Sequence, residues 1–150
     1  ESAGAVVGDT IKLDADNTTV TTAVGAAPVI GTITAVQATE ETAYGAFASG
    51  ASDSIDLLIV TATNGNGDLS ADAVDGTQLL TDFIIDPASG MTVVADAEFY
   101  ILAYDDTSAY LYYAHEQNSA TTLTDTEIVL IATIQNITAG SFVAEDFILG

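Results

Sequence analysis

The chain alternates apolar and polar positions over many short stretches, and this period of two indicates β-strands with one buried face. The stretches are rich in β-branched residues, which fit a pleated surface. Clusters of Gly, Asn, Asp and Pro separate many of them. The predicted strands cover Val6–Leu13, Thr18–Val24, Pro28–Gln37, Ile55–Ala62, Glu98–Tyr104, Ala109–Ala114, Glu127–Ile134 and Phe142–Leu149.

Helical periodicity is almost missing from the chain. Two stretches are candidates for one short helix each: the Ala-rich Glu40–Ala48 and Leu69–Phe83. No repeat or linker divides the 150 residues, and a hydrophobic content of 49% is enough for a core. The sequence predicts a single all-β domain: an antiparallel β-sandwich or short β-roll with at most one or two short helices.

The last third of the chain carries the clearest pattern. Tyr100-Ile-Leu-Ala-Tyr-Asp-Asp-Thr-Ser-Ala-Tyr-Leu-Tyr-Tyr113 predicts a β-hairpin around an Asp-Asp-Thr-Ser turn. Ile128-Val-Leu-Ile-Ala-Thr-Ile134 and Glu145-Asp-Phe-Ile-Leu-Gly150 follow it. This arrangement resembles the C-terminal region of RTX-type secreted proteins, whose tails combine a Tyr-Asp hairpin, an Ile-Ala strand and a terminal Asp-Phe segment.

The resemblance implies secretion to the cell surface or the exterior by a one-step (type I) route that reads the carboxyl end, and an association with calcium. The Gly-Gly-x-Gly-x-Asp repeat of that family does not occur in this sequence. The resemblance therefore implies a flanking module or a stand-alone protein that shares the tail.

The net charge of −21, from 22 acidic residues and a single Lys12, excludes several partners. With so few cations the chain is not expected to bind nucleic acid or an anionic membrane surface. No apolar run reaches the ~18 residues that cross a bilayer, so neither membrane insertion nor an intact signal peptide is expected. Spread over ~7,000 Å², the charges lie ~18 Å apart, beyond the screening length of ~8 Å.

The strongest metal candidate is Asn64-Gly-Asn-Gly-Asp-Leu-Ser-Ala-Asp72, because calcium loops place oxygen ligands at alternate positions. One register uses Asn64, Asn66, Asp68, Ser70, Asp72 and Asp75, but it has Leu69 where Gly belongs. A register shifted by two residues places Gly67 correctly and loses the first and last carboxylates. The alternative is an Asn-Gly turn after the strand Ile55–Ala62.

Two further acidic pairs lie in predicted turns: Asp14 with Asp16, and Asp105 with Asp106. Such residues usually hydrogen-bond to the turn backbone. A shared calcium ion is the alternative, if a second segment brings more oxygens.

Nothing in the sequence indicates catalysis. His115 is the single imidazole and there is no Cys, so a zinc site cannot be built, and no nucleophile motif is present. Carboxylate pairs suited to glycoside hydrolysis have no specificity among 22 acids. Tyr110 and Tyr112 share one face of the predicted hairpin and Tyr113 the other, which favours cross-strand pairing over a sugar-binding or self-association patch.

Three functions are compatible with these features. The favoured one is a non-catalytic structural subunit of an extracellular assembly (filament, surface layer or matrix). Such a subunit would be a homo-oligomer or polymer, joined through strand edges and stabilised by calcium. The second is the C-terminal export and calcium-folding module of a larger secreted hydrolase or toxin. The third is a carbohydrate- or adhesin-type binding domain that contacts a glycan.

Overall fold

A computed structural model describes residues 11–14, 30–33, 56–60, 69–71, 75–80, 91–105, 107–118, 122–138, 140–143 and 146–149. Within these ranges the chain is built from strands and short helical turns, as the period-two pattern predicts, and the all-β class is confirmed. The candidate strand Thr18–Val24 and the candidate helix Glu40–Ala48 lie outside the described residues.

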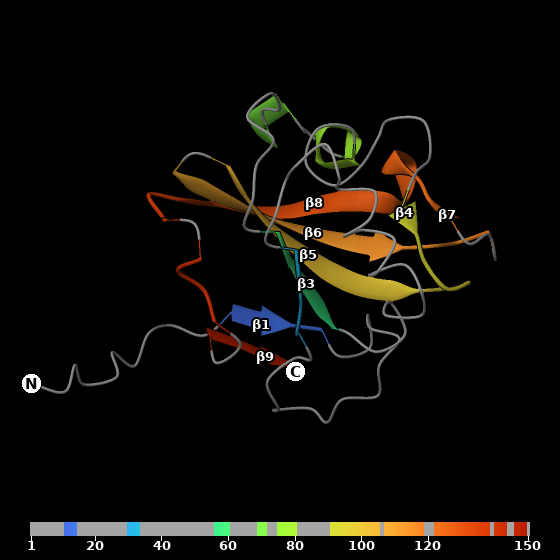
Figure 1. Cartoon of the computed structure of the whole chain (residues 1–150), viewed down its shortest axis with the longest axis horizontal. Helices are drawn as coiled ribbons and strands as arrows, with labels where there is room; N and C mark the ends of the chain where they lie inside the picture. Colours follow the sequence, from blue (N-terminus) through green and yellow to red (C-terminus); the bar gives the residue numbers. More distant parts are fainter. Residues whose placement is uncertain are drawn as a thin grey trace, which may run out of the picture.

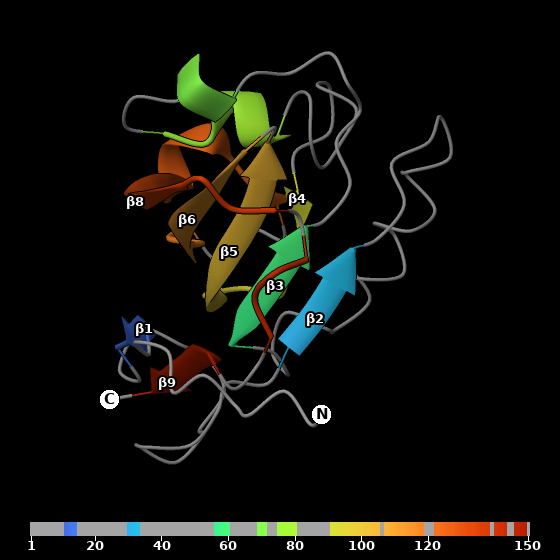
Figure 2. The ribbon, with the colours of Figure 1, turned by 90° about the vertical axis from the view of Figure 1, so that its left-hand side faces the viewer.

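The central element is a five-stranded sheet with the order β2-β3-β5-β6-β8 (Figures 1 and 2). Its strands are β2 (Ile30–Ile33), β3 (Leu57–Val60), β5 (Glu98–Asp105), β6 (Ser108–His115) and β8 (Ile128–Gln135). Strands β5, β6 and β8 pair in the expected antiparallel manner, whereas β2, β3 and β5 run parallel. The sheet is therefore mixed.

The β5–β6 hairpin forms in the predicted register. Asp105 pairs with Ser108 and Tyr100 with Tyr113, so the chain reverses at the predicted Asp-Asp-Thr-Ser turn. All four residues of strand β3 are buried, as are the six central residues of β5. A parallel strand covered on both faces reads as a continuous apolar run, which explains why Leu57–Val60 shows no alternation.

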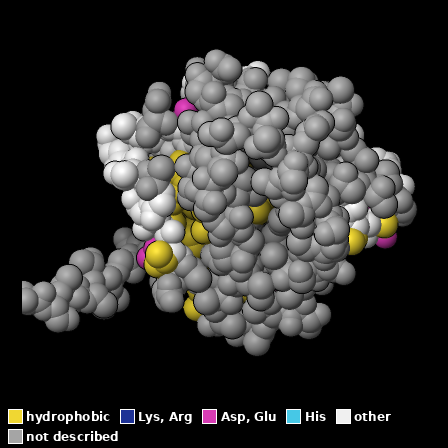
Figure 3. All heavy atoms as spheres, in the orientation of Figure 1, with side chains coloured by type: hydrophobic (Ala, Val, Ile, Leu, Met, Phe, Trp, Pro, Cys, Tyr) yellow, Lys and Arg dark blue, Asp and Glu magenta, His cyan; other side chains and the backbone are white. Residues whose placement is uncertain are grey.

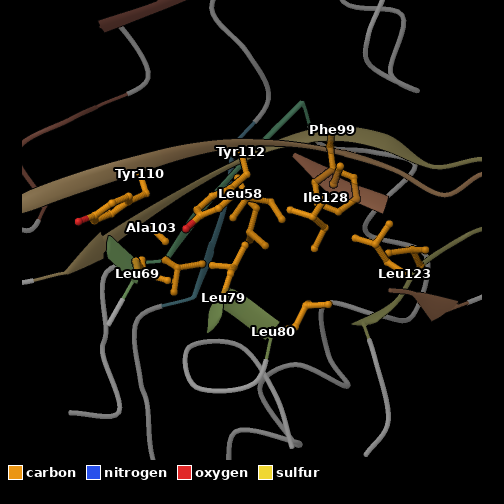
Figure 4. Close-up of a cluster of buried hydrophobic side chains, with 14 of the residues drawn as sticks. Leu58, Leu69, Leu79, Leu80, Phe99, Ala103, Tyr110, Tyr112, Leu123 and Ile128 are labelled. Carbon is orange, nitrogen blue, oxygen red and sulfur yellow. The ribbon is translucent and has the colours of Figure 1, made fainter. Parts of the chain in front are cut away.

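Side chains of alternate residues in the sheet pack into two separate hydrophobic cores, one on each face. The first core lies between the sheet and the short turns at η3 (Leu69–Ala71) and residues 77–80, which occupy part of the candidate helix Leu69–Phe83. Leu58, Tyr112 and Ile128 meet Leu69 and Leu79 in this core (Figure 4).

The second core lies on the opposite face, under a two-stranded parallel sheet of β1 (Ile11–Leu13) and β9 (Phe147–Leu149). Figure 2 shows this pair on the side of the main sheet away from the helical turns. Leu13, Phe147 and Leu149 are buried there against Tyr100 and Tyr104. A third small sheet pairs β4 (Met91–Thr92) with β7 (Thr122–Leu123).

The tyrosine prediction is confirmed. Tyr110 and Tyr112 enter the first core, and Tyr113 packs against the second. Tyr100 and Tyr104 are also buried, and their hydroxyls bond to backbone groups of Asp14 and Phe142. These four buried side chains serve packing and cannot form an exposed sugar-binding platform.

Candidate association surface and carboxylate sites

Strand β8 forms one edge of the main sheet. Among the described residues, one bridge is formed on its outer side, between Asp75 and Val129. Beyond Val129 the strand continues to Gln135, while its inner side pairs with β6. Unpaired edge backbone is a template for pairing with another strand.

A β-bulge divides β8 in two. Leu130 pairs with Tyr112 and Ala132 pairs with Leu111, so Ile131 is the extra residue. Because a bulge shifts the side-chain phase by one, Ile128 and Leu130 pack on the first core while Ala132 and Ile134 pack on the second.

The bulge leaves large apolar side chains in solvent. Val129 and Ile131 are 50% and 51% exposed, and Thr133 and Gln135 are also exposed. Strand β8 contains no charged residue and no Pro, although the chain carries 22 acidic residues. Charges and Pro are the usual devices that protect an edge strand from pairing. Within the described ranges, the features of this edge that oppose pairing are the bulge and the Asp75 bridge.

Four of the predicted metal ligands lie within the described residues: Asp14, Ser70, Asp75 and Asp105, of which Ser70 is exposed in η3. The Oδ1 atom of Asp75 accepts hydrogen bonds from the Thr77 backbone N–H at 3.2 Å and from its hydroxyl at 2.7 Å. Asp105 Oδ2 accepts the Leu69 N–H at 3.0 Å, and Asp14 is exposed at the end of β1. Asp75 thus holds its own turn, which is the ordinary role of such residues, whereas Asp105 joins the hairpin turn to the start of η3.

The other predicted ligands lie outside the described residues: Asp16, Asn64, Asn66, Asp68, Asp72 and Asp106. Within the described ranges no group of three or more acidic or His side chains is placed to hold a metal ion. Calcium binding therefore stays a prediction.

Two buried glutamates were not predicted from the sequence. Glu116 is fully buried, and its two carboxylate oxygens accept the backbone N–H groups of Asp96 at 2.8 Å and Asn118 at 2.7 Å. Asp96 has a positive φ of 58°, so Glu116 stabilises a left-handed turn just before β5.

Glu127 ends the η5 turn (Asp125–Glu127) and is 7% exposed. It accepts hydrogen bonds from Thr124 N–H and hydroxyl at 2.8 and 2.9 Å, and from Gln117 N–H and Asn118 Nδ2 at 3.1 and 2.8 Å. Burial alone raises the pKa of this carboxyl, but the donors together outweigh burial and lower the pKa. The spacing Thr124-x-x-Glu127, a capping-box pattern, was the signal available in the sequence.

His115 belongs to a small polar group at the end of the hairpin. Its Nε2 lies 3.1 Å from Glu98 Oε1, directly across the β5–β6 pair. Tyr113 stacks between His115 and Tyr100, with ring centroids 6.2 and 5.6 Å away. Burial, followed by the charge of Glu98, raises the pKa of Tyr113 to about 12. This arrangement is a cross-strand ion pair beside aromatic packing.

Acidic and hydrophobic side chains appear among the coloured atoms of the face in Figure 3, and none there has the colour of Lys or Arg. No helix of the described residues has the length and apolarity needed to cross a membrane. Comparison with models of protein families, with curated proteins and with solved structures gave no match.

Proposed function

We propose that this chain is a non-catalytic structural subunit of an extracellular assembly, which associates with copies of itself through strand edges. The observation that carries the proposal is the outer side of β8, where a long, uncharged strand ends the main sheet beside a half-exposed Ile131. Such an edge gains hydrogen bonds and apolar burial when another strand joins it.

The distribution of charge supports a second copy as the partner. Two chains that each carry −21 repel wherever their acidic surfaces meet. Strand β8 is a stretch at which two copies approach without placing carboxylates against each other. The single Lys12 gives the chain little means of attracting an acidic partner.

The packing of the polar groups supports a structural role. The ion pair with Glu98 accounts for His115, and the buried Glu116 and Glu127 bond to turn backbone. These carboxylates hold loops at one end of the sheet. The tyrosines, which the carbohydrate-binding alternative would use, are largely buried in the two cores.

Secretion and calcium binding belong to the same proposal and rest on the resemblance of the last third to RTX-type tails. In this account the acidic turns gather calcium, which stabilises the subunit or bridges neighbours. Calcium also reduces the repulsion between copies, because it neutralises carboxylates at the surface.

The test is sedimentation and electron microscopy of the purified 15.3 kDa chain, in calcium and again after chelation. We expect particles heavier than the monomer, and we expect chelation to lower the thermal midpoint or loosen the particles. A monomer at every concentration and salt would contradict the structural role. If chelation changes neither the particle mass nor the thermal midpoint, calcium binding is excluded from the account, while self-association is still supported.

A further inference from the structure

The outer side of β8 restricts how a second copy can join it. The bridge from Asp75 occupies Val129, and the strand ends at Gln135. A partner strand of about five residues is therefore accommodated opposite residues 131–135. We propose that two copies pair through this segment as antiparallel strands, related by a two-fold axis at Thr133. This inference rests on the proposed self-association and adds its geometry.

Charge selects the antiparallel arrangement. The acidic Asp125 and Glu127 lie at the amino end of β8, whereas Gln135 and the residues 136–138 after it are uncharged. Antiparallel pairing about Thr133 places the two Glu127 backbones ~40 Å apart, at ~3.3 Å per residue. That distance exceeds the ~8 Å screening length. Parallel in-register pairing would instead set each Asp125 ~5 Å from its copy.

The pleat then fixes the register. A two-fold axis perpendicular to the sheet leaves the same face of both subunits on the same side of the joined sheet. Two residues that lie opposite each other across the axis must therefore point to the same face. An axis at Thr133 satisfies this rule, because it places Ala132 opposite the partner subunit's Ile134, and both positions lie on the second-core face. An axis at Ala132 would place Gln135 opposite Val129, where Asp75 is already bound.

The regular part of β8 covers four of the five residues of this segment, and Ile131 is the bulge residue at its start. Residues Ala132 to Gln135 pair without interruption with Leu111 to Ser108 of β6, beyond the bulge at Ile131. The backbone there has ordinary strand geometry and can extend the sheet. Joining two five-stranded sheets in this way gives one continuous sheet of ten strands.

A cysteine cross-link tests this register cleanly, because the chain contains no Cys. In Thr133→Cys the two thiols face each other across the axis, with Cα atoms ~4.5–5.5 Å apart, within disulfide range. Mild oxidation should convert the variant largely into a covalent dimer of twice the 15.3 kDa chain.

The matched control is Thr126→Cys, an equally conservative change at an exposed Thr just before β8. It should form no covalent dimer under the same oxidation, because the two copies of residue 126 lie far apart in the antiparallel pair. Circular dichroism and the thermal midpoint confirm that both variants fold.

The outcomes separate this inference from the proposed function. Cross-linking of both variants would indicate parallel stacking and overturn the antiparallel pair. No cross-linking under conditions where the chain sediments above monomer mass would overturn β8 as the contact and leave the structural role intact. Cross-linking of Thr133→Cys but not of Thr126→Cys supports the antiparallel pair. If no particle larger than a dimer then forms, the proposed extended assembly is contradicted and the antiparallel pair is still supported.

Discussion

Glu127 accepts four hydrogen bonds, and these bonds link η5 to the loop after β6. Its pKa is lower in the folded state than the ordinary value of 4.5. A lowered folded pKa stabilises the protein fully above the unfolded pKa, and this contribution is lost as pH falls through the folded value.

We therefore expect Glu127→Gln to lower the free energy of unfolding at pH 7 by about 1–3 kcal/mol, the range for bonds to a charged group. The difference from the wild type should shrink as the pH falls below about 4. Urea unfolding at several pH values measures both effects. Glu98→Gln is the control, because its partly exposed pair with His115 contributes only ~0–1 kcal/mol. An equal gap at every pH would show that the charge is not what matters.

For single residues, the sequence predicted the features that depend on the alternation of side chains along one strand. The opposite faces of Tyr112 and Tyr113 follow from the pleat alone, and the structure confirms them. The buried Glu116 and Glu127 were missed because their donors come from turns that fold next to them. From sequence alone, an acidic residue is assigned to the surface unless its hydrogen-bond partners are known.

The contact between the 75–80 segment and β8 depends on Gly76. A Cβ atom added to Gly76 would lie 2.7 Å from Ile128 Cγ2 and 2.8 Å from Ile128 Cβ, inside the first core. The Gly76 N–H also donates to the Asp125 carbonyl at 3.3 Å. A β-branched core side chain has little freedom to move away.

Gly76→Ala should lower the free energy of unfolding by about 1–3 kcal/mol through overpacking. The loss should be smaller in an Ile128→Ala background, because Cγ2 and Cδ1 are then removed and only the Cβ contact remains. Gly140→Ala is the comparison: it has open space and a φ of +77°, so its cost is backbone strain that adds independently of Ile128. A Gly76 cost that is unchanged in the Ile128→Ala background would contradict the close contact.

The positions of the longer strands were predictable, but strand order was not, and the predicted Phe142–Leu149 was too long because Phe142 and Val143 lie outside the strand β9. The hairpin and β8 match the predicted Glu98–Tyr104, Ala109–Ala114 and Glu127–Ile134 within a residue. The parallel pairing of β3 was missed, since a uniform apolar run does not specify its neighbours. The two-residue strands β4 and β7 are too short to carry a periodic signal.

The candidate site shows the same limit. The absence of charge in β8 is visible in the sequence, but its place at a sheet edge depends on contacts far along the chain. The bulge at Ile131, which changes the phase of the side chains, is equally non-local. An association surface of this kind is recognised only when pattern and topology are combined.

For the whole molecule, two features act on self-association in opposite directions. The net charge of −21 makes copies repel, and the uncharged edge strand β8 favours pairing between them. Repulsion between copies is long-ranged at low ionic strength, where the screening length is ~30 Å at 0.01 M, and weak at ~8 Å in physiological salt. Edge pairing acts at contact and is little affected by salt. The account thus places association at physiological or higher ionic strength.

The most direct test of this account is the sedimentation of Ile131→Lys beside Val143→Lys at physiological salt. The two side chains are almost equally exposed, at 51% and 52%, but only Ile131 lies on β8. Lysine in an edge strand opposes pairing, so Ile131→Lys should sediment as a 15.3 kDa monomer while Val143→Lys associates like the wild type. Equal association of both variants would contradict β8 as the contact between subunits.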